Sequence, residues 1–401
     1  MLLLKFDLIQ TIAFACFLYI LGIYVYDYFR MESSANIPPV IIGGAIFVIA
    51  RLLLKDKINF EFDFTFLVPS STIFFTIIGF GISIDSFKVA KREIAYLLAS
   101  AVGLLLLQDV VSFFLGKLLG LSPLVSFMTG SVSLTGGIGT VSSFISAIEP
   151  FMDTKGVMEI GIAFCSLGIL VVSLMGTQFC ARVIKRHNLH SVQNTTQNEK
   201  HISQFLFLEE QNSKVTLESI LMTLFQICFI AGVAITLSHY FATLGYAIPS
   251  ILIATIFAIV LRWCFDKTSK SHISHKILRY CANFNLMILL ALSMMSINLD
   301  YLTTLSLPLL VIFLAQVALA IAWCYFVTFK LFGSNYRGVL AMCGHLGFGL
   351  GITENSLVEM GNLSNTYEPD YKVTFATLIV AAFLIDIVNV YVLYLYFNLI
   401  Y

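Results

Sequence analysis

Polar side chains that could bind an ion stand inside apolar stretches of this chain. Asp386 and Asn389 lie three residues apart and therefore share one face of a helix. Gln108 and Gln316 each lie within an apolar run, and of the neighbours Gln108 and Asp109 we expect Gln108 to face the core. Oxygen ligands suit a hard cation such as sodium, and an ionisable residue within a membrane span is a functional hypothesis by default. We predict sodium ligands at Asp386, Asn389, Gln108 and Gln316; the alternative is hydrogen bonding between helices.

Two glycine-rich segments could supply the groups that bind a small anion. The first reads GSVSLTGGIGT over 130–140, and the second reads GHLGFGLGIT over 344–353. Glycine at this density weakens a helix and lets a ligand approach the backbone. Freed N–H groups can hold a carboxylate, while freed carbonyls and hydroxyls suit a hard cation. Close helix packing is the alternative. The predicted contacts are Ser131, Ser133, Thr135, Gly136, Gly137, Thr140, Gly344, His345, Gly347, Gly349 and Thr353.

The two halves of the chain repeat one spacing. From Gln108 it is 28 residues to Gly136, and from Gln316 it is also 28 residues to Gly344. Many secondary transporters consist of two inverted repeats whose broken segments meet at the substrate site near the membrane midplane. The spacing therefore favours inverted repeats over 1–184 and 217–401, joined by the polar linker 185–216.

Membrane-spanning helices must position these residues. Of the 401 residues, 59% are hydrophobic and 11% are charged, against about 25% charged in a soluble domain. This composition excludes a soluble globular fold, and the net charge of zero argues against a nucleic-acid partner. The apolar blocks have the length of a membrane-spanning helix and lack the alternation of a barrel strand. We predict an all-α polytopic protein in a lipid bilayer, with spans at about 8–26, 37–54, 64–84, 94–119, 157–183, 217–240, 246–265, 282–298, 305–332 and 373–397.

Two further segments, 122–148 and 337–362, are too polar to face lipid and too apolar for exposed loops. We predict that each re-enters the membrane as a hairpin whose unwound tip is buried in protein. With both termini outside, 17 Lys and Arg residues fall inside and 6 outside, as the positive-inside rule requires. The linker 185–216 is then cytoplasmic. Each half holds five spans, so the second half is inverted relative to the first.

Over essentially its whole length the sequence resembles the sodium/glutamate symporter family of bacterial inner membranes. The resemblance rests on GSVSLTGGIGT (130–140), CGHLGFGLG (343–351) and FLIDIVN (383–389). It implies sodium-driven uptake of glutamate or a similar anion, a homodimer, and an elevator-like movement of a core domain against a scaffold. The sequence departs from the family pattern at Ile138, where the family has His, and at Glu354 and Asn355, where it has small residues and proline.

The function that these observations favour is a sodium-coupled symporter that works by alternating access, with no enzymatic activity and no organic cofactor. A symporter of another organic anion and a channel are alternatives. An intramembrane serine hydrolase is a third, with Ser131 or Ser133 as nucleophile and His345 as base. The chain lacks the G-x-S-x-G motif of many serine hydrolases.

Overall fold

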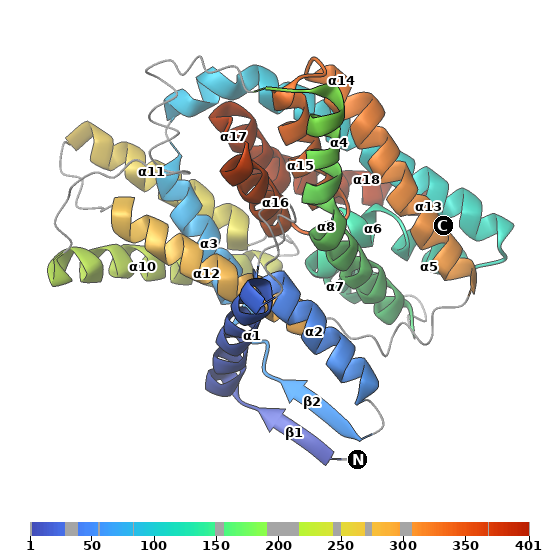
Figure 1. Ribbon diagram of the computed structural model, residues 1–401, viewed down its shortest axis with the longest axis horizontal. Coiled ribbons are helices and arrows are strands. Elements are labelled where there is room, and N and C mark those ends of the chain that lie inside the picture. Colours follow the sequence, from blue (N-terminus) through green and yellow to red (C-terminus); the bar gives the residue numbers. More distant parts are fainter. Residues whose placement is uncertain are drawn as a thin grey trace.

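The computed structural model is mostly helical (Figure 1). It describes residues 2–28, 39–54, 57–82, 84–148, 156–190, 216–243, 250–268, 275–296, 307–367 and 369–400. Most of the predicted linker, 191–215, lies outside these residues. Seven helices of the described part are long and apolar enough to cross a membrane, which confirms a multi-pass membrane protein.

The long helices include two rods in which a π-helical turn interrupts the α-helix. The five continuous helices are α1 (Leu8–Tyr28), α4 (Ile84–Leu118), α8 (Val157–His187), α10 (Leu217–Thr243) and α12 (His275–Ser296). One rod consists of α13 (Leu307–Trp323), η3 (Cys324–Thr328) and α14 (Phe329–Leu331). The other consists of α17 (Tyr371–Ile379), η4 (Val380–Leu384) and α18 (Ile385–Ile400). Such turns occur frequently at functional sites.

The remaining predicted spans are shorter apolar helices: α2 (Pro39–Leu53), α3 (Leu67–Gly81) and α11 (Ser250–Thr268). With 15 residues each, α2 and α3 are about 22 Å long, less than the roughly 30 Å of a bilayer's hydrocarbon. Both are shorter than the spans predicted at 37–54 and 64–84.

The all-α prediction missed a small sheet. Strand β1 (Leu2–Phe6) pairs in parallel with β2 (Ile58–Phe62), so that Leu2 lies opposite Ile58 and Phe6 opposite Phe62. In β2, Phe60 and Phe62 alternate with polar residues, which is the period of a strand. The rings of Phe6 and Phe62 stack with centroids 4.7 Å apart. This aromatic face stabilises a pair of strands that would be marginal alone.

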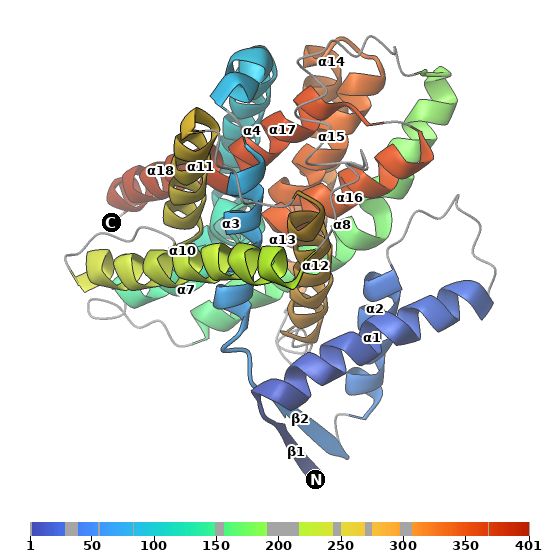
Figure 2. The ribbon, with the colours of Figure 1, turned by 90° about the vertical axis from the view of Figure 1, so that its left-hand side faces the viewer.

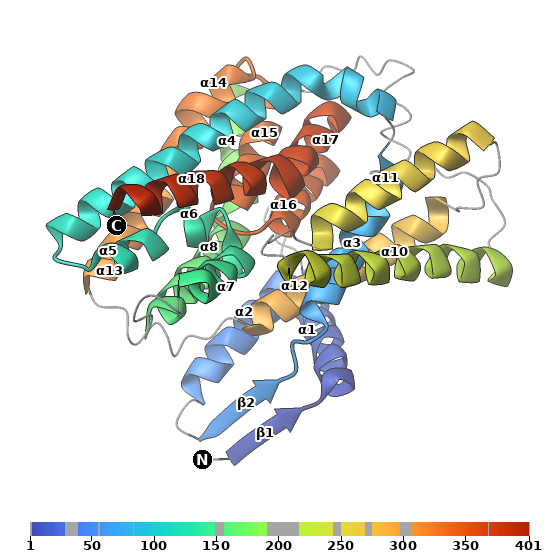
Figure 3. The ribbon, with the colours of Figure 1, turned by 180° about the vertical axis from the view of Figure 1, so that it is seen from behind.

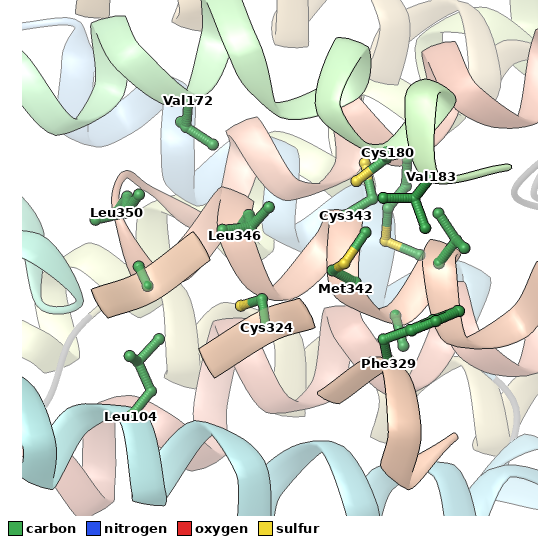
Figure 4. Close-up of a cluster of buried hydrophobic side chains, with 14 of the residues drawn as sticks. Leu104, Val172, Cys180, Val183, Cys324, Phe329, Met342, Cys343, Leu346 and Leu350 are labelled. Carbon is green, nitrogen blue, oxygen red and sulfur yellow. The ribbon is translucent and has the colours of Figure 1, made fainter. Parts of the chain in front are cut away.

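The helices form two packed groups, and each group takes elements from both halves of the sequence. In the first, α1 packs on α2, both contact α12, and α3 lies among α10, α11 and α12. The second holds α4 to α8 together with α13 to α18 (Figures 1 and 3). A buried apolar cluster within the second group joins α4 and α8 to η3 and α15; it includes Leu104, Cys180, Cys324, Cys343 and Leu350 (Figure 4).

The first glycine-rich segment consists of three helices, and the first two of them pack against α4. The three helices are α5 (Pro123–Met128), α6 (Ser131–Leu134) and α7 (Gly137–Ile148). Gly116 of α4 lies so close to Ser126 that a Cβ would come within 1.9 Å of its hydroxyl oxygen. Gly137, at the last break, has a φ of +71°, a conformation that glycine adopts without steric cost. From there α7 returns along α8, with Val141 against Gly161.

The second glycine-rich segment is an antiparallel pair of helices, α15 (Tyr336–Gly349) and α16 (Thr353–Thr366), seen from the side in Figure 2. The Asn335 side chain caps the start of α15 by accepting the Gly338 N–H at 3.1 Å. Arg337 lies 2.5 Å from Asp370, which follows α16. The pair therefore begins and ends at the same end of the protein, and its turn at 350–352 is buried or half-buried.

Candidate functional site

Gln108 joins the two glycine-rich segments. Its side-chain Nε2 donates to the carbonyl oxygen of Gly349 at 2.8 Å, and its Oε1 accepts a hydrogen bond from the Thr135 hydroxyl at 2.8 Å. Gly349 ends α15, and Thr135 follows α6. The side chain of Gln108 is fully buried. The breaks in both segments therefore meet at this one amide, in the second half of the long α4 helix.

Asp109, the next residue, binds the first segment. Ser131 donates its backbone N–H to Asp109 Oδ1 at 2.8 Å. The Ser131 hydroxyl lies 3.0 Å from Asp109 Oδ2 and 2.9 Å from Asn389 Oδ1. A serine hydroxyl carries one hydrogen, so two acceptor oxygens share it. Gly130 makes this approach possible, because a Cβ there would lie 2.7 Å from Asp109 Oδ1.

Gln316 adds a third amide to the same cluster. Its Nε2 donates to the backbone carbonyls of Gln108 at 2.8 Å and Thr129 at 3.3 Å. Its Oε1 is buried and has no hydrogen-bond partner. An unsatisfied buried acceptor costs about 1–3 kcal/mol, which a bound cation or water would offset. We call the side-chain oxygens of Asp109, Ser131 and Asn389 the oxygen cluster. Gln316 lies beside this cluster.

His345 belongs to a different hydrogen-bonded chain. Its Nδ1 lies 2.8 Å from the Thr328 hydroxyl, which in turn lies 2.8 Å from the hydroxyl of Ser100. Its Nε2 is buried without a partner. The Ser133 hydroxyl donates to the Gly130 carbonyl at 3.3 Å, and that of Ser131 bonds within the oxygen cluster. Neither serine pairs with His345, so the nucleophile and base that a hydrolase needs are not brought together.

Other predicted contact residues serve local packing. The Thr140 hydroxyl donates to the Gly136 carbonyl within the first segment at 2.8 Å. The Thr353 hydroxyl donates at 2.9 Å to the carbonyl of Ala381, in the π-helical turn η4. A Cβ on Gly344 would lie 2.6 Å from Thr377 Cγ2, and one on Gly347 would lie 2.4 Å from Ser356 Cα. At these two glycines, close helix packing explains the residue type.

Asn389, of the predicted pair Asp386 and Asn389, bonds to Ser131 in the oxygen cluster. Its side chain is 1% exposed, and its Nδ2 also donates to the Ser131 carbonyl at 3.4 Å. Asp386 lies half-buried at the start of α18, one turn earlier. The prediction did not include Asp109 among the ligands, although its carboxylate is buried in the cluster. The available signal was a second polar residue beside Gln108.

Comparison with known proteins gives one family. The family model described as sodium/glutamate symporter matches residues 4–369. The sodium/glutamate symporter of Escherichia coli K12 is 25% identical to this chain, over 98% of this chain and 98% of its own length. The sodium/glutamate symporter of Haemophilus influenzae is also 25% identical, over 96% of this chain and 95% of its own length. Among solved structures, the sodium proton antiporter MjNhaP1 from Methanocaldococcus jannaschii at pH 8 aligns over 96% of this chain and 95% of its own, with 12% identity and a TM-score of 0.42.

Proposed function

The chain belongs to the sodium/glutamate symporter family, and we propose that it carries glutamate or a related small carboxylate across the membrane together with sodium, by alternating access. The family is one of transporters, so the protein is not an enzyme. The relatives in Escherichia coli and Haemophilus influenzae bear the same name, which supports sodium as the coupled ion and glutamate as the substrate.

The main support for this proposal is that both glycine-rich segments contact the side chain of Gln108. Transporters built from inverted repeats bind their substrate where broken segments of the two repeats meet. Thr135 and Gly349 are both bonded to Gln108, and Gly137 lies against Ile352 of the other segment. The substrate carboxylate would bind at these breaks, where backbone N–H groups leave the regular helical pattern. Ser133, Gly136, Thr140, His345 and Thr353 would surround it.

Sodium would bind at the oxygen cluster. A carboxylate, a hydroxyl and amide oxygens are hard ligands, and the side chains of Asp109 and Asn389 each lie within hydrogen-bond distance of the Ser131 hydroxyl. The unpartnered Gln316 Oε1 supplies a further oxygen nearby. Asp386, one turn before Asn389, stays a predicted ligand. Gln108 would act by linking the segments, since both ends of its amide are bonded to protein.

The two glutamines at matching positions each bond to the opposite half, which supports inverted repeats over 1–184 and 217–401. Gln108, in the first half, donates to the Gly349 carbonyl in the second; Gln316, in the second half, donates to the Thr129 carbonyl in the first. The segments 122–148 and 337–362 would then re-enter from opposite faces. The linker 185–216 would be cytoplasmic, with both termini outside a bacterial inner membrane.

The two helix groups fit an elevator-type movement. The group of α4 to α8 and α13 to α18 holds every residue of the cluster and would move as the core. The group of α1 to α3 and α10 to α12 would form the scaffold and the interface of a homodimer. Several apolar side chains of α10 are exposed, including Leu221, Phe225 and Phe229, although lipid would also cover them.

Uptake into proteoliposomes tests the proposed function. Purified protein should accumulate radiolabelled glutamate when an inward sodium gradient is imposed, and uptake should saturate. A panel of aspartate, glutamate and other small organic anions identifies the substrate, including the alternative of a different organic anion. Uptake that does not depend on the sodium gradient would contradict sodium coupling. Downhill flux that does not saturate with substrate concentration would indicate a channel.

A further inference from the structure

A buried carboxylate lies outside the oxygen cluster. Glu359, on α16, is 1% exposed. Its Oε2 accepts the backbone N–H of Thr177, on α8, at 2.7 Å, and it also accepts the hydroxyl of Thr177. Gly176 leaves room for it, because a Cβ there would lie 3.2 Å from the same oxygen. A carboxylate inside the membrane part of a protein is costly and marks proton or ion pathways in many transporters.

Glu359 is part of a line of polar contacts between α8 and α16. Asn355 lies one helical turn before Glu359, and its Nδ2 donates to the Ser173 hydroxyl at 3.3 Å. Ser173 in turn lies one helical turn before Thr177. These four residues, Ser173, Thr177, Asn355 and Glu359, form what we call the polar seam. Since residues four apart share one face of a helix, the two contacts lie one above the other.

The polar seam has an unused acceptor. Asn355 Oδ1 is buried without a hydrogen-bond partner, as is the hydroxyl of the next residue, Ser356. A side-chain amide oxygen can only accept hydrogen bonds, so Asn355 lacks a donor. A protonated Glu359 would supply an O–H one turn away on the same helix face.

The polar seam runs from beside the proposed substrate site to Glu359, near the middle of α16. At one end, Gly351 lies against Asn355 Nδ2, two residues beyond the Gly349 carbonyl that Gln108 holds. Further along α16, Asn362 is half-buried and Thr366 is exposed. A group bound at Glu359 therefore lies between the substrate site and the surface of the protein.

Among the residues that the structure describes, thiols are titratable groups near Glu359. Cys343, on α15, is next to the carboxyl, and Cys180, on α8, touches Cys343 (Figure 4). His345, also on α15, is bonded to Thr328. In the helices that pack around α16, the charged residues lie near the helix ends. In the described part of α8, α12, α15 and α17 these residues are Glu159, Arg182, Lys185, Arg186, Lys276, Arg279, Arg337 and Lys372.

We propose that Glu359 binds and releases a proton in each transport cycle, so that substrate transport moves protons as well as sodium. The inference rests on the proposed transport function. On binding, the proton adds to a carboxylate oxygen, and the neutral acid donates its O–H to Asn355 Oδ1. On release, the proton leaves to water, and the carboxylate is again held by Thr177 alone. Neutral Glu359 lowers the cost of carrying the α15–α16 pair through the membrane.

The test is proton movement by the full-length protein in proteoliposomes with a pH-sensitive dye inside. With a sodium gradient imposed and the membrane potential clamped, addition of substrate to the wild type should change the internal pH. Glu359→Gln should abolish that signal and flatten the dependence of uptake on pH, while sodium-driven uptake persists. Glu218→Gln, at an exposed position, is the charge-matched control and should behave as the wild type.

A second variant keeps the test decisive if Glu359→Gln does not fold. Thr177→Val removes the hydroxyl that stabilises the charged carboxylate, so protonation becomes easier, and the midpoint of the pH profile should rise by roughly half a unit or more. An unshifted midpoint would overturn the proposal, as would a wild type that transports substrate without moving protons. Sodium-driven uptake itself would be unaffected by that result, so the proposed symport would stand.

Discussion

The Nε2 atom of Gln108 lies 2.8 Å from the carbonyl oxygen of Gly349, a residue 241 positions later in the chain. The same amide accepts the Thr135 hydroxyl, so one buried side chain fixes the distance between the breaks of both glycine-rich segments. Any movement that separates these segments to admit substrate must break the hydrogen bonds of the Gln108 side chain, or else Gln108 must move with the segments. Gln108 therefore couples the two halves of the proposed site.

Gln108→Leu should raise the substrate concentration for half-maximal uptake by about tenfold or more. The change leaves the Gly349 carbonyl and the Thr135 hydroxyl without their partner, at about 1–3 kcal/mol for each, and about 1.4 kcal/mol corresponds to one decade. Gln226→Leu makes the same change on α10, outside the cluster, and is the matched control. Equal uptake curves for the two variants would show that Gln108 does not couple the segments.

Asp109→Asn should weaken the sodium dependence of uptake. Removing one partner of a buried charge pair costs about 3–5 kcal/mol, so the sodium concentration for half-maximal uptake should rise by about tenfold or more. Asn389→Ala should shift it in the same direction but less, since a neutral ligand is lost. Asp386→Asn, measured alongside, shows which of the two acids holds the ion. If the sodium dependence is unchanged in Asp109→Asn and shifts strongly in Asp386→Asn, the ion binds at Asp386, one turn along α18, and not at Asp109.

Gly347→Ala should destabilise the protein. The new Cβ would lie 2.4 Å from Ser356 Cα, a backbone atom that cannot move without separating α15 from α16, and overpacking of this kind costs about 1–3 kcal/mol. Gly232→Ala, on α10, meets no atom within 4 Å and should be neutral or slightly stabilising, because alanine favours a helix. Thermal unfolding of the purified variants measures both effects. A Gly347→Ala variant as stable as Gly232→Ala would mean that the helices separate easily.

The predicted orientation is tested at Asn194, in the linker outside the described residues. A cysteine placed there should react with a membrane-impermeant reagent only when the reagent reaches the cytoplasmic face. The exposed cysteines Cys228 and Cys264 are replaced first, so that they do not contribute to the labelling. Reaction from the outer face alone would reverse the orientation.

Several polar residues of the proposed site stand out in the sequence against an apolar background. Gln108, Gln316 and Asn389 are polar residues within spans; Asn389 bonds to Ser131 of the oxygen cluster, and Gln316 donates to the backbone carbonyl of Gln108. Asp109 was missed because adjacent residues on a helix point about 100° apart, so one of the two neighbours was expected to face away. The first segment and α13 both pack on α4, and together they bury Gln108 and Asp109.

Other features depend on contacts that no local pattern reveals. Glu359 does not stand out in sequence, because most residues of α16 are polar. Its burial follows from packing on α8, α15 and α17. The strand pairing of β1 with β2 joins segments more than fifty residues apart, and the alternation in β2 spans only five residues. Such short signals are easily read as the aromatic edge of a membrane helix.

In the proposed function, sodium and a small carboxylate bind together where the two glycine-rich segments meet. Binding of radiolabelled glutamate to the purified protein in sodium or in potassium, at equal ionic strength, tests it most directly, because coupled binding requires each ligand to strengthen the other. We expect glutamate to bind in sodium, to bind at least about tenfold more weakly in potassium, and to lose this difference in Asp109→Asn. Equal affinity for glutamate in sodium and potassium would contradict it.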